Sequence, residues 1–172
     1  LIDRQNHHLF QPLLYQVATA GLSAPEIAQP VRDILAKRQN LRVVMEDVGS
    51  IDLAGQIVHT PSQQLPYEYL IIALGAVTSY FGNDQWEKFA PGLKTLEDAT
   101  RIRHSVLGAF EKAEICADAA ERKRLMTIVV VGGGATGVEM AGACAELTRK
   151  VLRNNFRNID TSETRILLVE AT

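Results

Sequence analysis

Apolar residues follow two different spacings along the chain, and each spacing predicts its own kind of element. Residues 41–73 alternate short apolar and polar stretches, and Ala54-Gly55 between two of them is typical of a hairpin turn. We therefore expect a small antiparallel meander over 41–73 that ends in a central strand, 67–73. Residues 95–118 repeat apolar side chains at helical spacing instead, which predicts one long helix.

The first forty residues predict shorter elements. Residues 1–3 are expected to end a buried strand, and residues 7–18 to form an apolar loop. Ser23 and Glu26 have the spacing of a capping box, and Pro30 suits the first turn of a helix. Short helices are therefore expected after Ser23 and from Pro30 onward.

The last third of the chain predicts the order strand, glycine-rich loop, long helix, polar loop, strand. The expected strands are 127–131 and 165–169, and the expected helix is 138–153. This order is half of a doubly wound α/β unit. The segment 76–94 contains two glycines and a proline and is expected to be a crossover loop between two domains, with Trp86 as a packing residue.

Composition narrows the class of protein. The chain has 172 residues, 47% hydrophobic, with 18 Lys and Arg against 20 Asp and Glu. These values are ordinary for a globular domain and argue against a disordered tail or a polybasic nucleic-acid binder. Two cysteines are too few for a disulfide-stapled scaffold. Because the chain starts at Leu1 with the end of a strand, we expect an internal fragment of a longer parent protein.

The strongest chemical signal is the glycine loop after the predicted strand 127–131. Gly132, Gly134 and Gly137 fit the pattern G-x-G-x-x-G in the strand–loop–helix context that the pattern requires. The first glycine permits a tight turn, the second lets a pyrophosphate approach the backbone, and the third allows close packing of helix and strand. This motif predicts a dinucleotide site, with a plain strand-to-helix turn as the alternative.

Acidic residues end two similar apolar strands. Glu170 follows Gly132 by 38 residues, longer than the roughly 20 of the minimal fingerprint, because a long helix and a polar loop intervene. A carboxylate there favours NAD over NADP; the alternative is a solvated acid at a strand end. Leu1-Ile2-Asp3 is similar to Leu168-Val169-Glu170, which suggests two dinucleotide folds in tandem.

Three segments carry a family resemblance. Residues 8–19 read HLFQPLLYQVAT, residues 67–75 read YEYLIIALG with Leu74 where Thr is usual, and residues 93–99 read LKTLEDA. With the glycine loop, they resemble the type II (non-proton-pumping) NADH:quinone oxidoreductases of the pyridine nucleotide–disulfide oxidoreductase superfamily. The similarity runs over essentially the whole chain.

The resemblance implies a fold and a set of site residues. The fold is α/β, with two tandem Rossmann-like folds, both incomplete: a partial FAD-binding domain over 1–92, which includes the meander, and a partial NADH-binding domain over 93–172. FAD contacts are implied for Asp3, Arg4, Gln11, Pro12, Val48, Ala73 and Gly75, and NADH contacts for Gly132, Gly134, Thr136, Gly137 and Glu170. Glu139 is implied to lie near the nicotinamide and the flavin; alternatively it is an acid favoured by the helix dipole.

The implied reaction has two steps. NADH gives a hydride to FAD, and the reduced flavin passes two electrons to a membrane quinone without proton pumping. The alternatives are a flavin-dependent NADH oxidase or reductase with a soluble acceptor, and a dinucleotide-binding module without turnover. The absence of cysteine from 4–60 argues against disulfide reductases, and Cys116 and Cys144 are expected to be packing residues.

The resemblance also implies partners and a location. We expect a homodimer that binds the membrane surface through a C-terminal region outside this chain, on the cytoplasmic face of the plasma membrane or on an organelle inner membrane. No nucleic-acid partner and no metal are expected, and His7-His8 is expected to be structural. The isolated chain, without the FAD glycine loop, is expected to bind FAD weakly or not at all and to be inactive.

Overall fold

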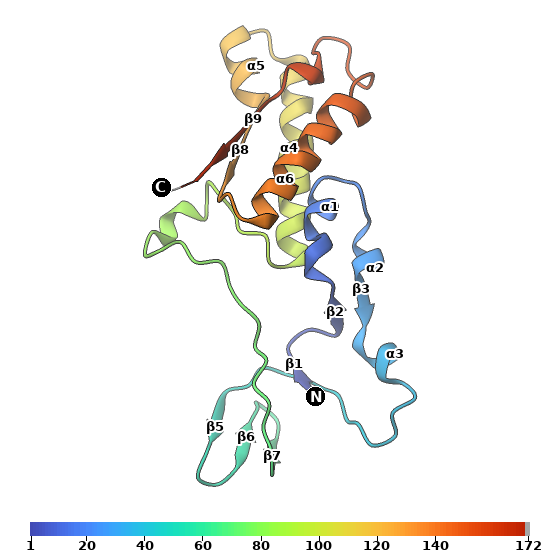
Figure 1. The fold of residues 1–172 in the computed structure, drawn as a ribbon, viewed down its shortest axis with the longest axis vertical. Coiled ribbons are helices and arrows are strands. Elements are labelled where there is room, and N and C mark those ends of the chain that lie inside the picture. The colour runs from blue at the N-terminus through green and yellow to red at the C-terminus, as the bar shows by residue number, and fades with distance from the viewer. Residues whose placement is uncertain (171–172) are drawn as a thin grey trace. The chain divides into compact units, whose positions relative to one another are not determined.

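A computed structural model describes residues 1–170 and divides the chain into two compact units (Figure 1). The first unit consists of residues 1–9 and 28–76, and the second of residues 10–27 together with residues from 77 onward. These units are defined by contacts, whereas the expected boundary between 92 and 93 separates cofactor sites. That functional boundary therefore stays a prediction.

The first unit contains a short parallel pair of strands. β1 (Ile2–Asp3) pairs with β4 (Val44–Met45), so that Ile2 lies opposite Val44 and Asp3 opposite Met45. The expected strand at 1–3 is confirmed, but the expectation that it is buried is wrong: Leu1 is exposed and its two neighbours are half-buried. Beside it, β2 (His7–Leu9) pairs antiparallel with β3 (Ala28–Pro30), and α3 (Val31–Leu35) follows.

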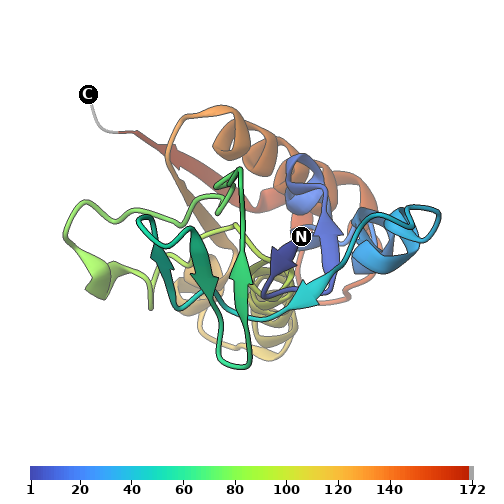
Figure 2. The same cartoon turned by 90° about the horizontal axis from the view of Figure 1, so that it is seen from below.

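The expected meander forms, over a shorter range (Figure 2). β5 (Ser50–Asp52), β6 (Ile57–His59) and β7 (Gln64–Pro66) make an antiparallel sheet in which Val58 lies opposite Ile51 and Leu65. The hairpin turn at 53–56 is confirmed: the Asp52 carboxylate accepts from the N–H groups of Ala54 and Gly55 at 3.0 and 2.9 Å. Residues 44–45 lie outside the meander because they pair with β1.

The expected central strand at 67–73 is wrong. Residues 67–76 form no strand, and Tyr69 and Ile71 are 91% and 90% exposed. A strand requires a neighbour for its backbone hydrogen bonds, and within the described residues no strand pairs with this segment. The apolar pattern that favours a strand is present, but the pairing that would complete one is not.

The second unit holds the α/β half-unit. β8 (Thr127–Val131) and β9 (Arg165–Val169) pair in parallel, with Val131 opposite Val169, as the sequence predicts. α6 (Ala135–Glu146) packs against both strands and continues as a π-helical turn, Leu147–Val151. α6 begins three residues before the expected start, because the glycine loop itself supplies its N-terminal cap. A 3-10 turn, Thr161–Glu163, precedes β9.

The long helix predicted over 95–118 is confirmed as one helix that ends three residues early, and a second helix follows it. α4 (Leu96–Ile115) ends where Cys116 turns extended, with φ of −81° and ψ of 122°. α5 (Ala119–Leu125) then begins, capped by the Asp118 carboxylate. The Arg122 side chain donates to the Cys116 carbonyl at 2.6 and 3.2 Å, which satisfies a backbone acceptor at the end of α4.

The core of the second unit consists of apolar side chains from α4, from the residue before β8, from the π-helical turn after α6 and from the polar loop before β9. The core residues are Phe110, Ala113, Met126, Leu147, Leu152 and Ile159. The rings of Phe110 and Phe156 lie 6.1 Å apart. Another apolar contact joins α1 (Leu14–Ala18) to α4 and α6.

The segment expected to be a loop, 7–18, therefore proves to contain regular structure. After β2, a 3-10 turn (Gln11–Leu13) leads into α1, whose Leu14, Val17 and Ala18 have at most 2% exposure. These three residues have helical spacing, and burial against α4 stabilises a helix too short to form alone. α2 (Ala24–Ile27) follows, with the Glu26 carboxylate accepting from the Ser23 N–H at 2.7 Å, as the capping-box spacing predicts.

The linker 77–94 is mostly irregular, as expected, with one 3-10 turn, Asp84–Trp86. Trp86 is 50% exposed, so the expectation that it packs is not met within the described residues. None of the helices within 1–170 combines the length and apolar character needed to cross a lipid bilayer.

Candidate nucleotide-binding site

The glycine loop connects the end of β8 to the start of α6. Gly132 has a φ of +103°, which an L side chain rarely adopts, so the turn requires glycine here. A Cβ on Gly137 would lie 1.8 Å from the Gly132 carbonyl oxygen. The helix therefore approaches the loop backbone as closely as the sequence pattern predicts for these two glycines.

Gly134 is the N-cap of α6 and leaves space in front of the helix. Within the described residues nothing lies within 4 Å of the position where its Cβ would be. The first N–H groups of a helix have no partner inside the helix, and the helix dipole makes this end positive. The arrangement suits a phosphate group, which could approach the backbone without meeting a side chain.

Glu170 lies against the glycine loop although it follows the loop by more than thirty residues. β8 and β9 are parallel and in register to Val131 and Val169, so their carboxyl ends meet at one edge of the sheet. The Glu170 carboxylate accepts a hydrogen bond from the backbone N–H of Gly133. The structure thus brings together the two features that the sequence predicts for the nucleotide, the loop and the acid.

Thr136 and Glu139 lie in the first half of α6, and both are exposed. Thr136 is the second residue of the helix, within the turn whose N–H groups are free. Glu139 lies about one turn further along, on the same helix that begins at the loop. Both positions are compatible with contacts to a bound nucleotide.

Asp3 and Val48 occupy corresponding positions at the other predicted site. Asp3 ends β1, and Val48 follows the end of the parallel partner β4 by three residues. Asp3 therefore lies at the carboxyl end of one strand of this parallel pair, and Val48 lies just beyond the carboxyl end of the other. The Asp3 carboxylate accepts from the N–H of Gln5 at 2.9 Å, and Arg4 is exposed beside it.

The other residues predicted to contact FAD lie elsewhere. Ala73 and Gly75 are exposed in the unpaired segment of the first unit, and Gly75 has a φ of +72°. Gln11 and Pro12 belong to the second unit, in the 3-10 turn before α1. There the Gln11 side-chain amide donates to the Lys94 carbonyl at 3.4 Å.

The sequence did not predict a role for Gly133, which lies inside the glycine loop. The fingerprint assigns roles to the first, second and third glycines of G-x-G-x-x-G, and Gly133 occupies an unassigned position. The structure gives it the contact with Glu170. The run of three consecutive glycines, where the pattern needs only two, was the available signal.

The cysteines differ in environment. Cys144 is fully buried in α6, and burial raises the pKa of its thiol to about 11. Cys116 is half-buried, and its thiol lies 3.4 Å from the Asp118 carbonyl. The packing role predicted for Cys144 is confirmed.

Within residues 1–170 no three His, Cys, Asp or Glu side chains gather into a group that could hold a metal ion.

Comparison with known proteins places this geometry in a family. The family model for pyridine nucleotide-disulphide oxidoreductases matches residues 1–170. The chain belongs to this family.

Two relatives in the family come from Mycobacterium tuberculosis. The chain is 51% identical to its type II NADH:quinone oxidoreductase Ndh and 50% identical to NdhA, in each case over 99% of this chain. It spans only 38% and 37% of the length of these two relatives. Among solved structures, the NDH2 protein from Plasmodium falciparum in complex with NADH superposes with a TM-score of 0.85 at 28% identity, over 98% of this chain and 36% of that one.

Proposed function

We propose that the parent protein of this chain is a FAD-dependent NADH:quinone oxidoreductase of the type II, non-proton-pumping kind. The observation that carries the proposal is the identity of about one half with both mycobacterial type II enzymes over almost the entire chain. The feature of the structure that supports nucleotide binding is the glycine loop, with open space at Gly134 and the Glu170 carboxylate hydrogen-bonded to Gly133.

The NADH site that we propose is built from the β8–α6–β9 unit. The free N–H groups from Gly134 onward, including those of Thr136 and Gly137, would bind the pyrophosphate, and Gly132 would shape the turn beneath it. Glu170 would accept from the adenosine ribose hydroxyls and disfavour a 2′-phosphate. The bound nucleotides supply the hydride and electron chemistry, while the protein orients them and excludes water.

Glu139 is our candidate for a residue that contacts the reacting rings. It stands on α6 one turn beyond the pyrophosphate loop, and it is exposed. A nucleotide anchored at the loop and extended along the start of α6 would pass this carboxylate.

We also propose a set of residues that contact FAD. Asp3 would hold the FAD ribose, Arg4 would lie by the adenine, and the Val48 backbone would meet the adenine. Ala73 and Gly75 would approach the flavin nucleotide, and the turn at Gln11 and Pro12 the isoalloxazine ring. The position of Asp3 at one parallel strand end, and of Val48 just beyond the other, supports the ribose and adenine part of this proposal.

The proposed acceptor is a membrane quinone. We further propose that the parent protein is a homodimer and a peripheral membrane protein that binds the bilayer through a region outside this chain. Its location would be the cytoplasmic face of the plasma membrane or an organelle inner membrane. The names of the mycobacterial relatives support the quinone.

The test uses the parent protein with NADH. Oxidation is followed at 340 nm with a short-chain quinone, and in parallel with oxygen alone. We expect fast quinone-dependent turnover and much slower turnover with NADPH. If NADH is oxidised with oxygen alone and the added quinone does not change the rate, the proposal is contradicted. The protein would then be a flavin oxidase with a soluble acceptor. The isolated chain is expected to retain no flavin on purification, which an absorbance spectrum would check.

A further inference from the structure

The N–H groups of the three consecutive glycines have different partners. The Gly132 N–H donates to the Val169 carbonyl at 2.8 Å and so extends the hydrogen bonding between β8 and β9 by one residue. The Gly133 N–H donates to the Glu170 carboxylate. From Gly134 onward the N–H groups belong to the open end of α6. Of these groups, only the N–H groups from Gly134 onward are therefore available to bind phosphate. The Gly133 N–H is already bonded to the Glu170 carboxylate.

The contact between Gly133 and Glu170 leaves little room for a side chain. A Cβ on Gly133 would lie 2.9 Å from Glu170 Oε2 and 3.4 Å from both Cβ and Cγ of the same residue. Gly133 is not among the residues with positive φ, so the backbone itself would tolerate alanine. The neighbour that conflicts with a methyl group at position 133 is thus the Glu170 side chain.

We propose that Gly133 is a positioning residue for nucleotide specificity: its N–H and its missing Cβ hold Glu170 where the carboxylate selects a free adenosine 2′-hydroxyl. This inference rests on the proposed function, because it takes the β8–α6–β9 unit as the NADH site. It adds a role that the glycine fingerprint does not assign, and it concerns selectivity between nucleotides.

The chemistry of the carboxylate explains the selectivity. A carboxylate has two oxygens and several lone pairs, so Glu170 can accept from Gly133 through Oε2 and still accept from a ribose hydroxyl through Oε1. A hydrogen bond to a charged acceptor is stronger than a neutral one. A nucleotide that lacks the 2′-hydroxyl loses this bond, and one that carries a 2′-phosphate meets a like charge.

The experiment compares Gly133→Ala, Glu170→Gln and the double variant in the parent protein. Dissociation constants are measured by nucleotide fluorescence for NADH, for NADH lacking the adenosine 2′-hydroxyl, and for NADPH. Gly142→Ala is the matched control, because it adds the same methyl group to α6 where nothing lies within 4 Å in the described residues. The control is expected to leave all three constants unchanged.

We expect Gly133→Ala to weaken NADH binding about tenfold and to change binding of the 2′-deoxy nucleotide less than twofold. The preference for NADH over NADPH should fall by a similar factor. Glu170→Gln should reproduce the loss, and the double variant should be no worse than Glu170→Gln alone, because both changes act through one carboxylate.

Two results would overturn the inference and leave the proposed function standing. Equal losses for NADH and its 2′-deoxy analogue in Gly133→Ala would show that the methyl group disturbs the loop generally. Additive losses in the double variant would show that the two residues act separately. By contrast, failure of the unaltered parent protein to bind NADH, or to reduce quinone with it, would contradict the proposed function itself.

Discussion

The Glu114 carboxylate, on α4, accepts hydrogen bonds from the backbone N–H of Asn158 at 3.0 and 3.1 Å, across 44 residues of sequence. It also accepts from the N–H of Arg157 at 2.9 Å, while the Asn158 side-chain amide donates to the Glu114 carbonyl at 3.2 Å. These hydrogen bonds connect the polar loop that precedes β9 to the C-terminal end of α4. The position of β9, and with it that of Glu170, therefore depends partly on one carboxylate.

We predict a pH-dependent effect of Glu114→Gln on stability. Desolvation raises the pKa of Glu114, but the N–H groups of residues 157–159 and the charge of Arg122 outweigh it and hold the pKa below its ordinary 4.5. Stabilisation from a lowered pKa is fully present above 4.5 and is lost as the pH falls through the folded value. Thermal unfolding of the parent protein should show the variant less stable at pH 7, and the difference should shrink below pH 4.5.

Glu111→Gln is the control for this prediction, because Glu111 is an exposed acid on the same helix. Equal pH dependence of the two variants would mean that the Glu114 contacts add nothing to stability.

We predict that Gly137→Ala damages both stability and NADH binding. The new Cβ would overlap the Gly132 carbonyl oxygen, which is backbone and cannot rotate away, so the helix must shift. Overpacking of this kind costs about 1–3 kcal/mol. Gly142→Ala, also on α6 but in open space, should instead be neutral or stabilising by up to about 1 kcal/mol, because alanine favours helix. Urea unfolding of the parent protein and NADH titration would compare the two, and equal stability of both variants would contradict the packing argument.

Local patterns in the sequence predicted the β8–α6–β9 unit well because its elements follow one another along the chain. The strands at 127–131 and 165–169 are confirmed residue for residue, and the glycine loop between them has the predicted turn. Apolar runs bounded by glycine and polar residues are sufficient to mark such strands. The contact between Gly133 and Glu170 was not predictable in the same way, because it depends on the register of two strands.

Predictions failed where long-range contacts decide the structure. Residues 14–18 are too short to form a helix alone, and burial against α4 stabilises the helix that they form. Residues 67–73 have the composition of a strand, but no strand in the described residues pairs with them. In both cases the deciding factor is a neighbour that is distant in sequence, which spacing and composition do not reveal.

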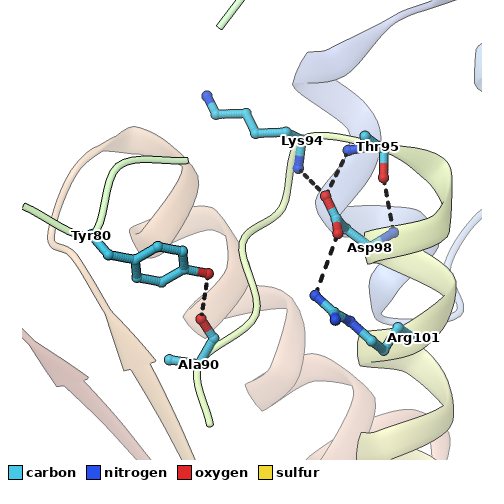
Figure 3. Close-up of polar contacts among 6 residues, drawn as sticks. All are labelled: Tyr80, Ala90, Lys94, Thr95, Asp98 and Arg101. Atoms are coloured by element: carbon cyan, nitrogen blue, oxygen red, sulfur yellow. Dashed lines mark hydrogen bonds and ion pairs between the residues drawn. The ribbon is translucent and has the colours of Figure 1, made fainter. Parts of the chain in front are cut away.

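We predict that Thr95→Ala destabilises the start of α4. The Thr95 hydroxyl accepts from the Asp98 N–H at 3.1 Å, and the Asp98 carboxylate accepts from the N–H groups of Thr95 and Lys94 at 3.0 and 3.1 Å (Figure 3). Loss of such a cap typically costs about 1 kcal/mol. Thr100→Ala, at an exposed position within α4, is the control, and urea unfolding is the measurement. A cap that contributes nothing would leave Thr95→Ala as stable as the control.

Thr161 supports a prediction about the buried end of the polar loop. Its hydroxyl is fully buried and donates to the Thr148 carbonyl at 2.7 Å, which joins the loop to the π-helical turn after α6. Thr161→Val keeps the shape and removes the donor, so the bond is lost inside the core. The expected cost is about 1–3 kcal/mol in urea unfolding. Thr100→Val, where the hydroxyl is exposed, should change stability by less than about 0.5 kcal/mol, and a similar value for both variants would contradict a role for the buried bond.

The buried thiol of Cys144 should resist alkylation while the protein is folded. Burial raises its pKa from 9.0 to about 11, so at pH 8 the thiolate that reacts is about a hundredfold scarcer than for an ordinary thiol of this kind. The side chain is also inaccessible, with 0% exposure, whereas Cys116 is half-buried. Treatment of the parent protein with iodoacetamide, followed by peptide mass mapping, should label Cys116 first and Cys144 only after unfolding in urea. Labelling of Cys144 at the rate of Cys116 in the folded protein would mean that α6 opens readily, and the close packing inferred for the glycine loop and its helix would then be wrong.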